Sequence, residues 1–92
     1  SPDQSHVTIH YLYRYSPYWY VANLSSKEIH KLDCHWVSLM SLRNKYYCAS
    51  LSEAASLIRD QEYNGCHYCL NRYDTDRHSR EVVLANLQAD LG

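Results

Sequence analysis

The chain has 92 residues, which is enough for one modest hydrophobic core and too few for two domains. Nine Lys and Arg oppose ten Asp and Glu, for a formal net charge of -1, so no overall field attracts nucleic acid or an anionic membrane. The longest apolar stretch is far shorter than the roughly 20 residues that span a bilayer, and the N-terminus lacks a signal-peptide pattern.

The supply of core side chains is thin for this length. The hydrophobic share of 46% includes ten tyrosines and four cysteines, and there is no Phe. Domains this small often add a metal, disulfides or oligomerisation, because burial only narrowly exceeds the conformational entropy lost on folding. We therefore expect one such stabilising device in this chain.

The first part of the chain predicts strands. Residues 7–15 place Val, Ile and Tyr on one face and mostly polar residues on the other, which is typical of a strand. Residues 16–17 are Ser-Pro and interrupt this pattern, and residues 18–22 are again aromatic and β-branched. An antiparallel pair joined at that break is expected, followed by a turn over 23–26 and a short extended segment over 28–30.

The middle of the chain predicts a helix that follows a strand. Residues 36–44 are ambiguous between a helical turn and a loop, and residues 46–49 are consistent with a strand. Ser50, with Glu53 three residues later, has the form of a capping box, so a helix should run from about residue 51 to residue 62. The Asn-Gly pair that follows supplies the left-handed residue that commonly ends a helix.

The end of the chain predicts a second helix over residues 77–91. Its apolar stripe consists of Val83, Leu84, Leu87 and Leu91. No repeat or linker divides the chain, so residues 1–92 are expected to form a single domain. The fold class predicted from these elements is α+β, with an antiparallel sheet, one central helix and a C-terminal helix.

The four cysteines permit either disulfides or a metal site. Cys66 and Cys69 form a C-x-x-C pair, a spacing that places two sulfurs on one side of a tight turn. His30 and Cys34 form a second pair on a different predicted element, and the two pairs complete a Cys3His set for one zinc ion. A reducing, intracellular (cytoplasmic) setting follows from this interpretation.

Other interpretations of these residues stay open at this point. The four can be ordinary reduced cysteines with a surface histidine, or the cysteines can pair as disulfides. Cys48 lies in a predicted aromatic strand and fits a buried small hydrophobe better than a fifth ligand. His35 and His67 each directly follow a ligand cysteine, so we expect them beside the site or on the surface.

Two features of the sequence are compatible with binding to nucleic acid. The aromatic residues between positions 11 and 20 can stack on bases, but without Phe the tyrosines must also build the core. Three arginines after Cys69 can meet phosphates, but three acidic residues are interleaved with them, which favours a solvated face of mixed charge. The arginines are Arg72, Arg77 and Arg80, and the acidic residues are Asp74, Asp76 and Glu81.

The order of these residues resembles the Ada-type metal-binding domain, most closely its relatives appended to bacterial nucleases and competence-type proteins. The matching text is Tyr20-Val21-Ala22-Asn23, Ser26-Lys27, His30 to Cys34, Trp36-Val37, Tyr46-Tyr47, Ser50 with Glu53-Ala54, Tyr63, and Cys66 to Cys69. The resemblance covers about residues 18–69 and implies a zinc-binding core there. It does not cover the first predicted strand or the last helix.

The resemblance also bears on whether the zinc site is catalytic. In Ada itself the first ligand is a cysteine that accepts a methyl group from damaged DNA, and this chain has His30 at that position. An imidazole bound to zinc offers no thiolate, and a site with four protein ligands leaves no open position for an activated water. We therefore expect a binding module rather than an enzyme. Methyl acceptance by a zinc thiolate such as Cys34 stays open as a weaker alternative.

The expected function is a structural-zinc module that mediates protein–protein interaction or self-association. A DNA-binding accessory domain of a nuclease or repair protein is the alternative. The chain begins Ser-Pro-Asp rather than with Met, so we expect it to belong to a larger protein or assembly. The two segments outside the resemblance are expected to form the interaction surface, because edge strands and apolar helix faces invite pairing. The residues expected there are Tyr11, Tyr13, Val83, Leu87 and Leu91.

Overall fold

The computed structural model describes residues 19–92, and the strand predicted over 7–15 lies outside them. The fold is α+β, with the central helix and the C-terminal helix that the sequence predicts. The elements in chain order are β1 (Tyr20–Asn23), β2 (Glu28–Lys31), α2 (His35–Leu39), the 3-10 helix η1 (Leu42–Asn44), β3 (Lys45–Cys48), α3 (Leu51–Gln61), β4 (Asn64–Gly65), the 3-10 helix η2 (Asn71–Tyr73) and α4 (Arg80–Leu91).

The sheet is mixed but mostly antiparallel. Its strand order is β3-β1-β2-β4, with β1 antiparallel to both of its neighbours and β4 parallel to β2. The strands on the two sides of β1 are β2 and β3. Neither is the strand over residues 7–15 that was expected to pair with this segment. The short parallel strand β4 was not predicted, because its two residues are too few to show any alternation.

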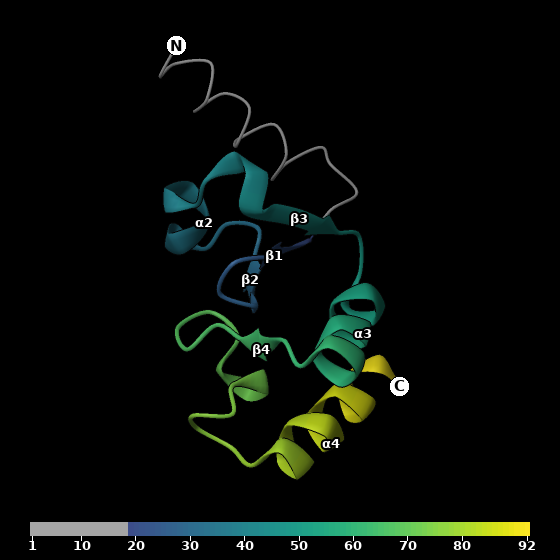
Figure 1. The fold of residues 1–92 in the computed structure, drawn as a ribbon. Coiled ribbons are helices and arrows are strands. Elements are labelled where there is room, and N and C mark those ends of the chain that lie inside the picture. The colour runs from purple at the N-terminus through teal and green to yellow at the C-terminus, as the bar shows by residue number, and fades with distance from the viewer. Residues whose placement is uncertain (1–18) are drawn as a thin grey trace.

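The two faces of the sheet carry different parts of the molecule. Side chains alternate along a strand, and the register places Val21 on one face with His30 and Tyr47, and Ala22 on the other with Ile29. The Ala22 face packs against α3 and α4, whereas Val21 packs with Val37 of α2. Figure 1 shows α3 and α4 side by side at one end of the molecule and α2 at the other.

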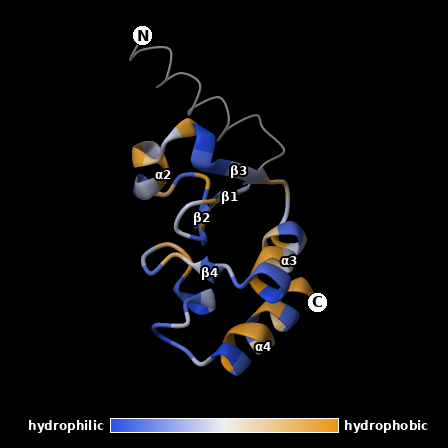
Figure 2. Ribbon diagram, in the orientation of Figure 1, coloured by the Kyte–Doolittle hydropathy of each residue, from blue (hydrophilic) through white to orange (hydrophobic). Residues whose placement is uncertain are grey.

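The two faces also differ in the amount of burial. Figure 2 shows hydrophobic residues concentrated on α3 and α4, and a second, smaller concentration on α2. The main core, on the Ala22 face, consists of Ala22, Ile29, Cys48, Ala54, Ala55, Ile58, Tyr63, Leu70, Tyr73, Val83 and Leu87. The small core, on the α2 face, consists of Val21, Leu32 and Val37.

The start of α3 confirms the predicted capping box. The Oγ of Ser50 accepts a hydrogen bond from the backbone N–H of Glu53 at 3.3 Å. The Glu53 carboxylate in turn accepts the backbone N–H of Ala49 at 2.7 Å. Both bonds satisfy N–H groups that a helix start otherwise leaves unpaired.

The end of α3 differs from the prediction. The left-handed residue is Glu62, with φ of 60°, and no glycine in the described residues has a positive φ. Gly65 lies instead in β4, where the chain passes close to its own backbone. A Cβ at this position would lie 2.6 Å from the carbonyl oxygen of Leu70 and 2.8 Å from the Cβ of Tyr73. Gly65 is therefore required by close packing rather than by backbone angle.

The last helix begins three residues later than predicted, because Ser79 caps it by accepting the N–H of Val82 at 3.3 Å. Val83 and Leu87 are 0% and 1% exposed and belong to the main core. The expectation that these two residues contact a partner is therefore wrong, since they face the interior. Leu91 is 40% exposed, and Tyr11 and Tyr13 lie outside the described residues.

No helix within residues 19–92 has both the length and the apolar character that a membrane span needs.

Candidate metal centre

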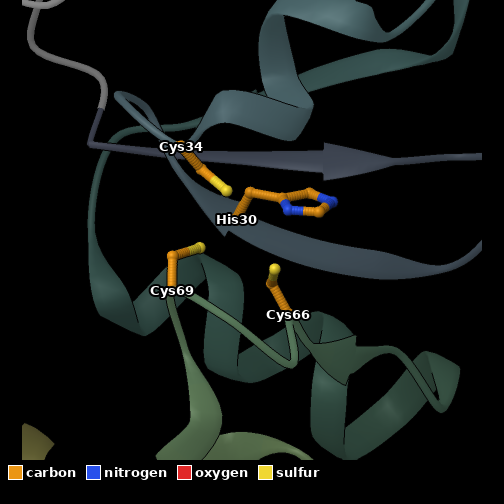
Figure 3. A group of neighbouring side chains, drawn as sticks. All are labelled: His30, Cys34, Cys66 and Cys69. Carbon is orange, nitrogen blue, oxygen red and sulfur yellow. The ribbon is translucent and has the colours of Figure 1, made fainter.

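Four potential ligand atoms converge on the α2 face of the sheet. One atom from each residue lies within 4.8 Å of the others, and Figure 3 shows the three sulfurs and the imidazole ring around a common space. A tetrahedral zinc site with three sulfurs and one nitrogen needs ligand atoms about 3.6 to 3.8 Å apart, so a contraction of about 1 Å or less closes the site. The residues are those predicted, namely His30, Cys34, Cys66 and Cys69.

Strand β2 and the turn after it position the first pair. His30 projects from β2 on the α2 face, where it is only 5% exposed. The chain then turns, with the N–H of Cys34 donating to the carbonyl of Lys31 at 3.0 Å. Cys34 is the N-cap of α2, and its own carbonyl accepts the N–H of Val37 at 3.0 Å. The beginning of α2 thus fixes the backbone of the second ligand.

The parallel pairing of β4 with β2 positions the second pair. The N–H of Asn64 donates to Lys27 at 2.8 Å, and the N–H of Cys66 donates to Ile29 at 2.8 Å. The turn that carries both cysteines closes when the N–H of Leu70 donates to the carbonyl of Cys66 at 3.0 Å. Since Ile29 directly precedes His30, this pairing brings the C-x-x-C turn beside the imidazole.

The imidazole of His30 has an unsatisfied nitrogen. Its Nδ1 is the one buried side-chain nitrogen or oxygen in residues 19–92 that has no hydrogen-bond partner. Such a group costs about 1 to 3 kcal/mol unless something else satisfies it. Burial also lowers the pKa of His30, which favours the neutral ring that binds metals. Figure 3 shows one ring nitrogen on the side that faces the sulfurs, so a metal ion in that space would satisfy it.

Backbone donors point at two of the three sulfurs. The N–H of Lys31 donates to the Sγ of Cys69 at 3.2 Å, and the N–H of Tyr68 donates to the Sγ of Cys66 at 3.4 Å. Burial and the nearby thiols of Cys34 and Cys66 raise the pKa of Cys69, whereas the hydrogen bond from Lys31 opposes that rise. Three thiols this close cannot all ionise without a cation, and a bound divalent ion removes that obstacle. The donor set therefore fits zinc.

Cys48 and His35 lie outside the cluster. Cys48 is fully buried in the main core, as its position in an aromatic strand predicts, and burial together with the charge of Glu53 raises its pKa to about 11. His35 is exposed and lies edge-on to the ring of Trp36, with ring centroids 5.7 Å apart. Neither residue belongs to the group of four ligands.

Asp74 is the residue near the site that sequence reasoning placed wrongly. Instead of lying on a solvated face it is 1% exposed, and it accepts hydrogen bonds from the side chain of Asn64 at 2.9 Å and the N–H of Asp76 at 3.0 Å. Its other oxygen lies 2.7 Å from Nδ1 of His67. Burial alone would raise the pKa of Asp74, but these hydrogen bonds outweigh it and lower the pKa.

This buried carboxylate ties the C-x-x-C turn to the segment before α4. No feature of the sequence separates Asp74 from the exposed Asp76 two residues later. Its burial depends on the fold of the turn, because Asn64 in β4 and His67 in the turn both reach it.

The three arginines that raised the question of phosphate contacts are engaged within the chain. Arg72 forms a two-pronged pair with Asp90, with distances of 2.9 and 3.0 Å. Arg80 donates to two carbonyl groups at the end of α3, and Arg77 lies 3.2 Å from Nε2 of His67. Each of these side chains therefore has a structural contact already.

Comparisons with known proteins add no further information about the chain. No family model, curated protein or solved structure matches it.

Proposed function

We propose that this chain is a binding module built around one structural zinc ion, and that its function is to contact a protein partner within a larger protein or assembly. The zinc ion would be held by Nδ1 of His30 and by the thiolates of Cys34, Cys66 and Cys69. When bound, zinc would supply a cross-link between two segments that are otherwise joined by the short parallel pairing of β2 and β4 and by a few side-chain contacts.

The observation that carries this proposal is the convergence of the four ligand atoms with a buried, unpaired Nδ1 among them. Buried polar groups nearly always have a partner, so an unpaired nitrogen that faces three sulfurs indicates a missing ligand rather than a defect of packing. Disulfides do not explain it, since all four cysteines are free and a disulfide leaves the histidine unpaired.

The energies support a structural role for the metal. Apparent binding energies of structural zinc in small domains are about 10 to 16 kcal/mol, whereas domains of ordinary size are stable by only about 5 to 15 kcal/mol. Within residues 19–92 the main core holds eleven residues and the small core three, and this burial does not replace a binding energy of that size. Folding and zinc binding are therefore expected to be coupled.

The same geometry supports binding rather than catalysis. Four protein ligands complete a tetrahedral shell, which leaves no position where a water could be activated. The resemblance to Ada-type domains supports a zinc core, while the histidine at the first ligand position does not support the methyl transfer of Ada. The engaged arginines and the net charge of -1 give the nucleic-acid alternative no specific support.

Elemental analysis and chelation together test this proposal. We expect one zinc ion per chain after purification without added metal, and loss of the folded circular-dichroism and NMR signals when a strong chelator is added. Refolding on addition of zinc is the control for irreversible damage. A chain without stoichiometric metal, or one that keeps its fold in the chelator, would contradict the proposal.

A further inference from the structure

An open groove lies beside the proposed zinc site, between α2 and the C-x-x-C turn. Its volume is about 490 Å³, and its walls include Trp36 and Leu39 on the α2 side, Tyr68 on the turn and Glu28 of β2. The aromatic and apolar side chains of these walls are unusually exposed for their size, with Trp36 44%, Leu39 62% and Tyr68 69% exposed. Exposed aromatic residues that line a concave surface are typical of a binding site.

The rings of the groove form a continuous row. Trp36 and Tyr68 have ring centroids 6.0 Å apart and planes inclined by 32°, so the row connects α2 with the turn. His35 packs edge-on against Trp36, and His67 packs edge-on against Tyr68 with centroids 5.2 Å apart. The exposed fractions of Trp36 and Tyr68, 44% and 69%, leave part of each ring accessible to a ligand. The electron-rich face of an aromatic ring attracts a cation.

The electrostatic character of the groove also favours a cation. The carboxylate of Glu28 lines the groove and forms no hydrogen bond or ion pair with any residue in the part of the chain that the structure describes. Asp74 and Asp76 are close enough to add to its negative field, and His67 opposes them only when protonated. A zinc ion held by three thiolates leaves a net negative formal charge beside the same groove.

Arg77 is a basic residue of the segment that follows the C-x-x-C turn. Its guanidinium contacts Nε2 of His67, on the side of that ring away from Asp74. It is not among the residues that line the groove. Within residues 19–92, Glu28 therefore has no ion-pair partner, and it lies beside two exposed aromatic rings.

We propose that this groove binds one lysine or arginine side chain of a protein partner, with the cation against Glu28 and over the ring faces of Trp36 and Tyr68. The inference rests on the proposed function, since the zinc-held turn places Tyr68 opposite Trp36. It adds the chemistry of the contact, because the apolar stem of a basic side chain suits Leu39 while its charged end suits the carboxylate.

The test uses the full zinc-loaded chain and two short peptides that are blocked at both ends. One peptide carries a central lysine and the other carries norleucine, which keeps the aliphatic stem and removes the charge. In a ¹⁵N NMR titration we expect the lysine peptide to shift the Trp36 indole signal and the amides of Glu28 and Tyr68. Its affinity should be at least fivefold higher than that of norleucine and should fall with salt.

Substitutions in the groove test which residues contact the peptide. Glu28→Gln keeps the shape of the side chain and should weaken lysine binding about three- to tenfold, and Tyr68→Ala or Trp36→Ala should weaken it by a similar factor. The matched controls are Glu81→Gln on α4 and Trp19→Ala, which change an exposed acid and an exposed tryptophan outside the groove. Both controls should bind the peptide within about twofold of the unmodified chain.

Four results would overturn the inference. These are equal binding of norleucine and lysine, shifts of the groove signals with protein concentration alone, stronger shifts of the same signals by an oligonucleotide, and a folded, zinc-loaded chain with no lysine-dependent shift. The last result would leave the zinc proposal standing. A purified chain that lacks zinc or a folded spectrum would contradict the zinc proposal instead, so the two failures are distinguishable.

Discussion

The two faces of the sheet are organised by different physical means. On one face, α3 and α4 bury a core of eleven residues that includes Ile58 and Leu87. On the other face, α2 buries a core that holds three of the described residues, and the four ligand atoms gather beside it. The four potential ligand atoms thus lie beside the smaller of the two hydrophobic cores.

The burial energy of the small core can be compared with the entropy cost of ordering the segment beside it. Three buried aliphatic side chains contribute on the order of 5 kcal/mol. Fixing the backbone of residues 30–41, which carry the first ligand pair and α2, costs about 1 to 2 kcal/mol per residue. The three residues of the small core therefore do not order this segment by themselves, and the proposed zinc ion would add the binding energy of a cross-link there.

The largest expected effect comes from removing a ligand. Cys66→Ala should abolish stoichiometric zinc binding and leave the chain unfolded, because it removes a thiolate that nothing replaces. Cys48→Ala is the matched control, since Cys48 and Cys66 are 0% and 1% exposed and lose the same atoms. The control should keep one zinc and lose about 1 kcal/mol of stability. Elemental analysis and thermal unfolding measure both, and equal behaviour of the two variants would refute the ligand assignment.

The second prediction asks whether the two faces fold together. Ile58→Ala should lower the free energy of unfolding by about 3 to 4 kcal/mol, and Val37→Ala in the small core by about 2 kcal/mol. If zinc binds only the folded chain, each variant should lower the apparent zinc affinity by its own loss of folding energy. Ile58→Ala, in the main core, should thus reduce the apparent zinc affinity more than Val37→Ala does.

Competition with a chromophoric chelator measures these affinities. An Ile58→Ala variant with unchanged zinc affinity would show that the main core folds without the metal. The two faces would then be independent rather than coupled.

The third prediction concerns the junction between the two faces. Gly65→Ala places a methyl group 2.6 Å from a backbone oxygen, so the chain before Cys66 must shift. We expect a loss of about 2 kcal/mol and weaker zinc binding, because strain of this kind typically costs 1 to 3 kcal/mol. Gly92→Ala at the chain end, where the nearest atom is 3.1 Å away, is the control and should change little. If both variants unfold at the same temperature, the close packing at Gly65 does not limit the stability of the fold.

The smallest effect is a dependence of stability on pH that comes from the main core. Burial raises the pKa of Cys48 from 9.0 to about 11, so the folded state disfavours the thiolate. The contribution of the neutral thiol is complete below about pH 9 and is lost as the pH rises towards 11. The free energy of unfolding should therefore fall between pH 9 and 10 in the unmodified chain, and less steeply in Cys48→Ala. Identical slopes in chemical denaturation would contradict the buried, neutral thiol.

The sequence predicts the local features of this molecule better than its pairings. Ser50 and Glu53 identify the start of α3, and the spacing within each ligand pair identifies the residues of the cluster, because both signals come from residues close together in the chain. The parallel contact of β4 with β2 was not predictable, since it joins segments more than 30 residues apart through two residues only. Asp74 and Gly65 owe their environments to that contact, so sequence reasoning misplaced both.

The apolar stripe of α4 is a second case in which the sequence does not specify the packing partner. Val83 and Leu87 read equally well as a core face or as an interface, because periodicity reports burial without naming the partner. The structure shows that the partner of these two residues is the main core. Of the described residues expected at an interface, only Leu91 is exposed.

The most direct test of the account is zinc K-edge X-ray absorption on the purified chain. The structure predicts one zinc ion with three sulfurs at about 2.3 Å and one nitrogen at about 2.0 to 2.1 Å. The His30→Ala variant should lose the nitrogen contribution or the zinc itself. A spectrum of the unmodified chain with oxygen ligands, with four sulfurs, or with no stoichiometric zinc would contradict a site formed by His30 and the three cysteines.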